Sequence, residues 1–319
     1  MPQPNNFAKG FNNYPRAFGK IGMSPLLAPM ALYAFDGTWN EEKDAGRYDL
    51  NTNVVRFKDL YDGKKFFYQG VGTKHGTAGK FIGGAFGVGG HGRIEDAKRD
   101  LSRQLAAGDR DIDIVGFSRG AALAVHFANV VGDGIRVGDA TEVPPVRFLG
   151  VFDIVAAFGI PIDIGLSFNR INLGYKLGLA KVVKQCYHAI ALDESRKAFR
   201  PTRVRGGCEV WFRGVHSDVG GGNNNHALND ITLRWMLHKA IASGLPMKTD
   251  CVGTGCTRAN IDGKIGNNFD KILSRPREPK PDDRFHYTVG TRPKHVNPPD
   301  PCTRETEITE AQAVLVAIS

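Results

Sequence analysis

The stretch DIDIVGFSRGAALAV (residues 111–125) places a serine, Ser118, between an apolar run and a helical pattern. The residues before it have the composition of a buried strand, and AALAVHFANVV after it is typical of a helix. Gly116 and Gly120 remove the side chains that would collide where a strand turns sharply into a helix. Such a turn holds a nucleophilic serine clear of the backbone and directs the next N–H, here that of Arg119, at a developing oxyanion. The alternative is a serine that only caps a buried helix.

Five short apolar runs have the length and composition of buried strands: residues 31–35, 65–69, 112–117, 146–152 and 209–215. Most of them lack polar–apolar alternation, so we expect both faces of their sheet to be covered. Residues 93–108 and 227–246 repeat apolar side chains every three or four positions, which predicts helices. Strands that alternate with helices predict an α/β fold, with a mainly parallel central sheet and helices on both faces.

Two of these strands are followed by residues that could serve Ser118. VRFLGVFDIV ends its apolar run at Asp153, and EVWFRGVHSDVGGG ends its run at His216. Because the carboxyl ends of parallel strands meet at one edge of a sheet, we expect the three residues to lie together. A serine needs a base and the base needs an acid that orients it, so His216 is the candidate base and Asp153 the candidate acid.

Other residues compete for these two roles. Asp218, which lies two residues after His216, and Asp193 in HAIALDESR could each be the acid. His188 could be the base, although it begins an apolar run rather than ending one. Asp153 could instead be a turn residue at a strand end, and His216 a hydrogen-bonded structural histidine.

The first predicted strand ends in FDGTWN. A loop at this edge of the sheet could supply a second oxyanion donor, for which the backbone N–H of Gly37 or Thr38 is the candidate, with Asp36 fixing the loop. A plain Asp-Gly turn is the alternative.

GVGGHG (87–92) matches G-x-G-x-x-G, but the residues before it make a poor strand and no acidic residue follows a clear second strand. We therefore expect a flexible loop beside the site there, and not a dinucleotide site.

A formal net charge of +9 favours anionic partners. The basic residues are scattered and do not interleave with aromatic ones, so we expect no nucleic-acid partner. No segment approaches the roughly 18 uninterrupted apolar residues of a membrane-spanning helix. The first 20 residues lack the apolar core of a secretory signal, so we expect synthesis in the cytoplasm without a signal peptide.

The chain has five cysteines, which are too few and too odd in number for a disulfide framework, although Cys251 and Cys256 in CVGTGC could pair. No His or Cys cluster has the spacing of metal ligands, and serine chemistry needs no metal. We therefore expect no metal ion and no cofactor.

Composition divides the chain into three parts. Residues 1–29, rich in Asn, Pro and Gly, predict a loosely ordered extension. Residues 30–274 predict one catalytic domain, and the Pro-rich and C-terminal residues 275–319 a segment packed on that same domain.

Residues 158–185 resemble a lid-like insertion that follows Asp153. Its apolar residues accompany Lys176, Lys181 and Lys184, a combination that suits acyl chains and anionic head groups at a membrane surface. The alternative is that the apolar residues pack on the core and the lysines are solvated.

Eight blocks in order resemble one family: FDGTWN, NVVRF, YQGVGT, GGAFGVG, GFSRGAA, LGVFDIV, HAIALDESRKAF and EVWFRGVHSDVGGG. They span about residues 31–245 and are similar to the type VI secretion lipase effectors and the uncharacterised α/β-hydrolase-domain proteins around them. The resemblance implies an α/β-hydrolase fold, with the nucleophile at Ser118, the acid at Asp153 and the base at His216. The sequence departs from the family in being short and in having RGAALAV where a bulkier aromatic residue often follows the glycine and alanine, and we expect no large C-terminal membrane-anchoring domain.

The resemblance also implies a function. In its best-known members the family is a phospholipase A delivered into rival bacteria, so we expect a serine hydrolase of lipid esters that acts peripherally at a membrane surface. An immunity protein, a secretion-spike protein and delivery to the periplasm or membrane of a target cell are implied in the same way. A small-ester or thioester hydrolase is the alternative activity, and a non-catalytic nucleotide- or partner-binding module is the alternative of another class.

Overall fold

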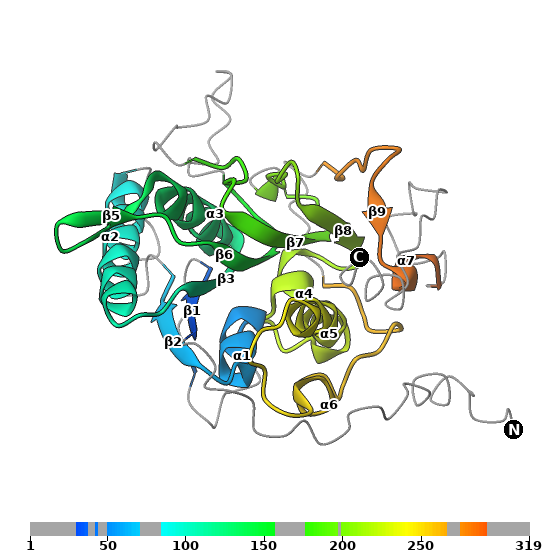
Figure 1. Ribbon diagram of the computed structural model, residues 1–319. Helices are drawn as coiled ribbons and strands as arrows, with labels where there is room; N and C mark the ends of the chain where they lie inside the picture. Colours follow the sequence, from blue (N-terminus) through cyan, green and yellow to red (C-terminus); the bar gives the residue numbers. More distant parts are fainter. Residues whose placement is uncertain are drawn as a thin grey trace, which may run out of the picture.

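A parallel sheet forms the centre of the protein, which we describe from a computed structural model (Figure 1). The structure describes residues 30–37, 42–43, 50–70, 84–156, 176–196, 199–266 and 275–291, with the side chains of 84–88 and 291 left out. Seven strands pair in the order β2-β1-β3-β6-β7-β8-β9, and every pair is parallel. The strands are β1 (Met30–Phe35), β2 (Lys64–Tyr68), β3 (Asp111–Phe117), β6 (Val146–Phe152), β7 (Val183–Ala191), β8 (Cys208–Phe212) and β9 (Arg284–Phe285). A separate antiparallel hairpin consists of β4 (Ile135–Val137) and β5 (Ala140–Glu142).

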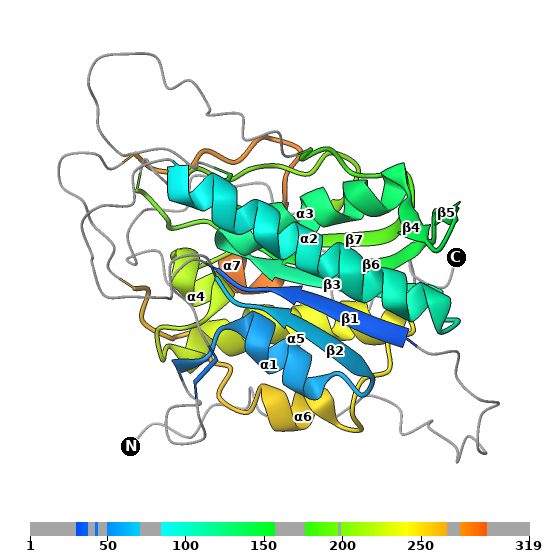
Figure 2. The same ribbon diagram turned by 90° about the vertical axis from the view of Figure 1, so that its left-hand side faces the viewer.

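Helices cover both faces of the sheet (Figure 2). One face carries α2 (Gly84–Ala106) and α3 (Ser118–Asp133), and the other carries α1 (Asn53–Leu60), α5 (His226–Ala242) and α6 (Cys251–Gly255). Two short helices, α4 (His216–Gly220) and α7 (Tyr287–Thr291), complete the described elements. The predicted fold class, a mainly parallel sheet between two helical layers, is confirmed.

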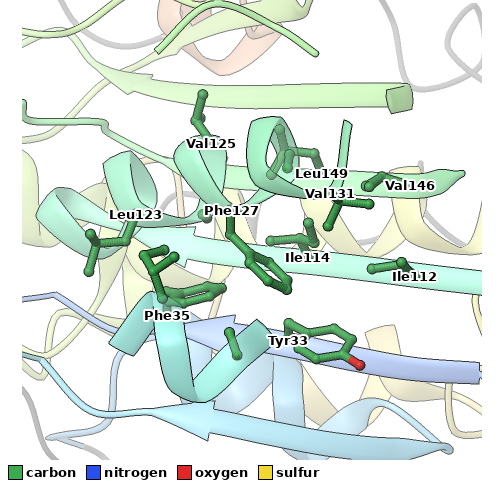
Figure 3. Close-up of a cluster of buried hydrophobic side chains, with 14 of the residues drawn as sticks. Tyr33, Phe35, Ile112, Ile114, Leu123, Val125, Phe127, Val131, Val146 and Leu149 are labelled. Atoms are coloured by element: carbon green, nitrogen blue, oxygen red, sulfur yellow. The ribbon is translucent and has the colours of Figure 1, made fainter. Parts of the chain in front are cut away.

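The two faces of β1 explain why its sequence does not alternate between polar and apolar residues. Tyr33 and Phe35 point into the core under α2 and α3, where Phe127 packs against both rings (Figure 3). Leu32 and Ala34 point into the core on the other side, under α1 and α5. Because water reaches neither face from Ala31 to Phe35, both faces of these residues favour apolar side chains.

One strand of the sheet, β7, was not predicted from the sequence, and one was predicted too long. β7 contains exposed polar residues near its start and a buried, hydrogen-bonded His188 in its middle, so only the short apolar run after His188 is visible in the sequence. β9 has two residues and is the edge strand of the sheet, and it lies in the Pro-rich stretch 275–301, whose composition is typical of a surface excursion or an edge strand. β8 ends at Phe212, before the predicted 215, because the chain turns at Gly214, where φ is 122°.

GVGGHG (87–92) lies inside α2, so the predicted flexible loop is wrong. A helix of 23 residues absorbs these glycines because the apolar positions that follow, from Ile94 to Leu105, bury one of its sides in the core. A phosphate-binding glycine turn must stand between a strand and a helix, and this segment does not.

The lid prediction fails for the part of 158–185 that the structure describes. Residues 176–182 run along α3, where Asn129 Nδ2 donates to Gly178 O and Lys176 N–H donates to His126 Nδ1. Leu177 and Leu179 pack on the core. Lys184 belongs to β7 and Lys181 lies just before it, at the amino ends of the strands, and Lys176 Nζ pairs with Asp133 at the last residue of α3. These lysines therefore lie away from the edge where Ser118 stands; residues 158–175 lie outside the described residues.

Several other predictions concern segments that the structure describes only in part or not at all. The predicted extension 1–29 lies outside the described residues, and of 275–319 the described part, 275–291, contributes β9 and α7. The division into these parts stays a prediction. Cys251 and Cys256, at α6, are free thiols. Within the described residues, no helix combines the length and apolar character needed to cross a bilayer.

Candidate active site

The carboxyl ends of the central strands lie level with one another. Phe117, the last residue of β3, pairs with Phe152, the last residue of β6, and β7 and β8 pair as far as Ala191 and Phe212. Ser118 therefore follows β3 at the same height at which Asp153 follows β6. His216 is the first residue of α4 and lies at this same edge. A short turn joins it to Phe212, where β8 ends.

The side chains of these three residues form a hydrogen-bonded row. His216 Nε2 lies 2.8 Å from Ser118 Oγ, and His216 Nδ1 lies 2.5 Å from Asp153 Oδ2. With Nδ1–H donating to the carboxylate, Nε2 keeps a lone pair that can accept the Ser118 hydroxyl proton. Ser118 and His216 are 5% and 6% exposed and Asp153 is fully buried, so the row is almost entirely shielded from water.

The backbone at Ser118 is strained in the way a sharp strand-to-helix turn requires. Its φ is 59°, in the left-handed region, and φ of Asp153 is 41°. A non-glycine residue in that region costs about 1–2 kcal/mol, so packing around the turn must hold it in place. The close approach of α3 to the end of β1 provides this packing, because a Cβ atom at Gly120 would lie 2.2 Å from Asp36 O.

Gly120→Ala is therefore expected to lower the free energy of unfolding by about 3 kcal/mol and to reduce activity by moving Ser118. Gly92→Ala is the matched control, because no atom lies within 4 Å of a Cβ at Gly92 in α2. That change should stabilise the protein by about 0.5–1 kcal/mol through helix propensity. Urea unfolding of both variants measures the difference. A Gly120→Ala protein as stable as the parent would contradict the packing described for the turn.

Aromatic rings fix the plane of the His216 imidazole. Its centroid lies 4.6 Å from that of Phe117 and 4.9 Å from that of Phe199, which meets it edge-on. Arg196 in turn stacks on Phe199, 3.5 Å from the ring centroid. The imidazole is thus held between two rings, with its nitrogens directed at Ser118 and Asp153.

Arg277 was not predicted from the sequence to be a site residue. It lies on the far side of the Asp153 carboxylate. Its Nη1 is 2.6 Å from Asp153 Oδ1 and its Nη2 is 3.0 Å from Asp153 Oδ2. Burial alone would raise the pKa of Asp153, but Arg277 and His216 hold it well below its ordinary value. Burial lowers the pKa of His216 and Arg277 adds to this, whereas Asp153 opposes it.

Glu194 is a second carboxylate that the sequence did not bring forward. It is buried, and its Oε2 accepts the backbone N–H of His216 at 3.2 Å. Arg196 pairs with both of its oxygens, at 2.9 and 2.8 Å, and lowers the pKa that burial would raise. Glu194 therefore fixes the backbone of the candidate base, while Asp153 contacts its ring.

The competing residues have other partners. Both carboxylate oxygens of Asp218 are occupied by four donors: the backbone N–H groups of Val215 and Gly266 and the side-chain amides of Asn223 and Asn225. Asp193 accepts from Arg213 Nε and from Gly214 N–H. His188 contacts Glu209 through Nδ1 and accepts Ile154 N–H through Nε2. These interactions tie loops and strands together, and none of them joins Ser118.

The predicted oxyanion donors are described in part. Arg119 N–H belongs to the first turn of α3, where the helix dipole favours negative charge. Gly37 N–H donates to Asp36 Oδ1 at 2.7 Å, which opposes a role for Gly37 as the second donor, and Thr38 lies outside the described residues. Asp36 is buried at the end of β1, and burial raises its pKa to about 7.

The sheet, the helical layers and the serine at a strand-to-helix turn define a protein of α/β-hydrolase type. A family model described as the type VI secretion system (T6SS) phospholipase effector Tle1-like catalytic domain matches residues 32–138 and 132–239. The chain belongs to this family, and the resemblance noted in the sequence is confirmed.

Among solved structures, an uncharacterised protein from Pseudomonas aeruginosa is similar, with 18% identity and a TM-score of 0.50 over 73% of this chain and 49% of that one. The Tle1 effector bound to the VgrG spike of the type 6 secretion system has 26% identity and a TM-score of 0.43 over 62% of this chain and 52% of that one. An uncharacterised protein of Saccharomyces cerevisiae, YEL023C, is 29% identical over 97 residues, which are 29% of this chain and 14% of the yeast protein. The chain thus spans about half the length of the two solved proteins.

Proposed function

We propose that this protein is a serine hydrolase of lipid esters, with phospholipid as its substrate, and that Ser118, His216 and Asp153 are its catalytic residues. The observation that carries the proposal is the continuous row from Ser118 Oγ through His216 to Asp153 at the carboxyl edge of the sheet. Membership of a family described by its phospholipase effectors supports the choice of substrate.

In the proposed reaction, Ser118 Oγ attacks the ester carbonyl while His216 Nε2 takes its proton. His216 then gives this proton to the departing alcohol, and the acyl group remains on Ser118. Water, activated by the same imidazole, releases the fatty acid and restores the serine. Asp153 keeps Nδ1 protonated and stabilises the imidazolium that forms in both halves of the reaction.

The oxyanion that forms in each half needs backbone donors. Arg119 N–H is the first candidate, because it stands directly after the nucleophile at the start of a 16-residue helix. Thr38 N–H is the second candidate, because Asp36, two residues before it in the sequence, lies against Gly120.

The family description also supports a biological setting. We propose that the protein is a type VI secretion effector that meets a spike protein during delivery and an immunity protein in protected cells. Its substrate would then be the membrane lipid of the target cell.

Release of fatty acid from phospholipid vesicles tests the substrate. We expect the wild-type protein to release fatty acid, at a rate that rises when a dispersed short-chain phospholipid forms micelles, and Ser118→Ala to release none. Hydrolysis of soluble short-chain esters with no release from vesicles or micelles would contradict the lipid substrate and leave a small-ester hydrolase.

A further inference from the structure

Arg277 is a buried cation in an exposed stretch of chain. It is 7% exposed, whereas its neighbours Arg275, Pro276 and Glu278 face solvent. The stretch contains several basic residues, and this one alone among the described residues 275–280 turns into the core beneath the carboxyl edge of the sheet. Placing an arginine there is costly unless the charge is paired and its N–H groups are used.

The guanidinium is paired and hydrogen-bonded through both terminal nitrogens. Nη1 donates to Asp153 Oδ1 and, at 2.7 Å, to Ala191 O. Nη2 donates to Asp153 Oδ2 and to Phe199 O. The two-point contact fixes the plane of the carboxylate, and Oδ2 of that carboxylate is the atom that contacts His216 Nδ1.

The segment that carries Arg277 is anchored independently. Asp283 accepts from both terminal nitrogens of Arg203, at 2.9 and 2.6 Å, and from Trp211 Nε1 at 2.9 Å. β9 then pairs with β8. The segment 275–285 is therefore held in place by Asp283 and β9, and it positions Arg277 against Asp153.

We propose that Arg277 is a positioning residue that keeps Asp153 ionised and oriented toward His216, and that it thereby sets the lower pH limit at which Ser118 is reactive. The inference rests on the proposed function, because it assigns Arg277 to the same row. Arg277 acts through Asp153, since its terminal nitrogens donate to that carboxylate and to two backbone carbonyls.

The charged groups that surround His216 determine the direction of the effect. They are Asp153 and Arg277 on the Nδ1 side, Glu194 with its partner Arg196 at the backbone N–H, and Asp218 on α4 itself, which is bonded to loop N–H groups and amides. Without Arg277, His216 would be easier to protonate, because a positive charge is lost nearby. Asp153 would also be easier to protonate, because a buried carboxylate would lose its cation. Both changes move the onset of reactivity to higher pH.

The test is the rate at which a fluorophosphonate probe labels Ser118 as a function of pH. For Arg277→Met we expect the acid limb to move up by roughly one pH unit or more, with an upper limit of about three pH units, which corresponds to unit charges about 4 Å apart at an effective dielectric constant of about 20. Arg277→Lys keeps the charge and should keep the limb near its wild-type position, with a lower plateau because the two-point contact is lost. The control is Arg275→Gln, which removes an exposed ion pair with Glu278 in the same segment and should leave the profile unchanged.

A folded Arg277→Met protein with the wild-type acid limb would overturn the inference, whatever its plateau. If Arg277→Met does not fold, the double variant Asp153→Asn/Arg277→Met removes both charges and avoids a one-sided buried ion. We expect it to label at the same rate as Asp153→Asn alone, and a further tenfold loss would overturn the inference. Absence of labelling in the wild-type protein at every pH would instead overturn the proposed function, and this inference with it.

Discussion

Ser118→Ala is expected to lower kcat for ester hydrolysis by on the order of 10⁶-fold, to the limit of detection. The reason is that no other hydroxyl stands at His216 Nε2, within the described residues, to take over the attack. Alanine has the same backbone preferences as serine at a φ of 59°, so the turn and the fold should persist. Hydrolysis by highly purified protein, followed with a chromogenic ester, measures the loss, and thermal unfolding shows whether the fold is intact.

Ser102→Ala is the matched control for this change. Ser102 lies in α2, and its Oγ donates to Arg136 O at 2.6 Å, away from the site. We expect its kcat to equal that of the wild type. Ester hydrolysis by Ser118→Ala at more than a small fraction of the control rate would mean that Ser118 is not the nucleophile.

Asp153→Asn is expected to lower kcat by on the order of 10⁴-fold with little change in KM. An asparagine could donate to His216 Nδ1, which would place the proton on Nε2 and remove the base. The same change leaves Arg277 buried without its carboxylate, so we also expect a loss of about 3 kcal/mol in the free energy of unfolding. Steady-state kinetics and urea unfolding separate the two effects.

Asp218→Asn tests whether any buried carboxylate near His216 would have the same effect. Asp218 is as buried as Asp153 and lies two residues from His216, but its oxygens accept from loop N–H groups and amides. We expect a loss of about 1–3 kcal/mol in stability, because the new amide would face donors, and a kcat within severalfold of the wild type. The reverse outcome, a severe kinetic loss in Asp218→Asn and a mild one in Asp153→Asn, would exchange the roles of the two residues.

The sequence was sufficient to predict which residues lie together at the carboxyl ends of the strands. In a parallel sheet, residues that follow neighbouring strands meet at one edge, so the positions of Ser118 and Asp153 after apolar runs predict their proximity. The fold class followed from the same alternation of strands and helices. His216 was found by the same argument, although the strand before it ends earlier than predicted and a short helix completes the approach.

The remaining features depend on contacts between distant segments, which local patterns do not encode. Arg277 is 124 positions from Asp153 and looks like any other charged residue in a Pro-rich stretch. β7 escaped notice because its buried His188 is satisfied by Glu209, and a polar residue interrupts an apolar pattern even when it is fully bonded. The lysines after residue 175 suggested a membrane contact. They lie instead at the edge of the sheet opposite Ser118, because the chain enters β7 there.

Peptide mapping after fluorophosphonate labelling tests the proposed chemistry most directly. Trypsin should release residues 111–119, DIDIVGFSR, in which Ser118 is the one hydroxyl or thiol side chain, so an adduct on this peptide identifies the nucleophile without a mutation. We expect the adduct mass on this peptide in the native protein, and none after the protein is denatured before labelling, because reactivity depends on His216 and Asp153. An unlabelled 111–119 peptide from native, folded protein, or an adduct on another residue, would contradict Ser118 as the nucleophile of this site.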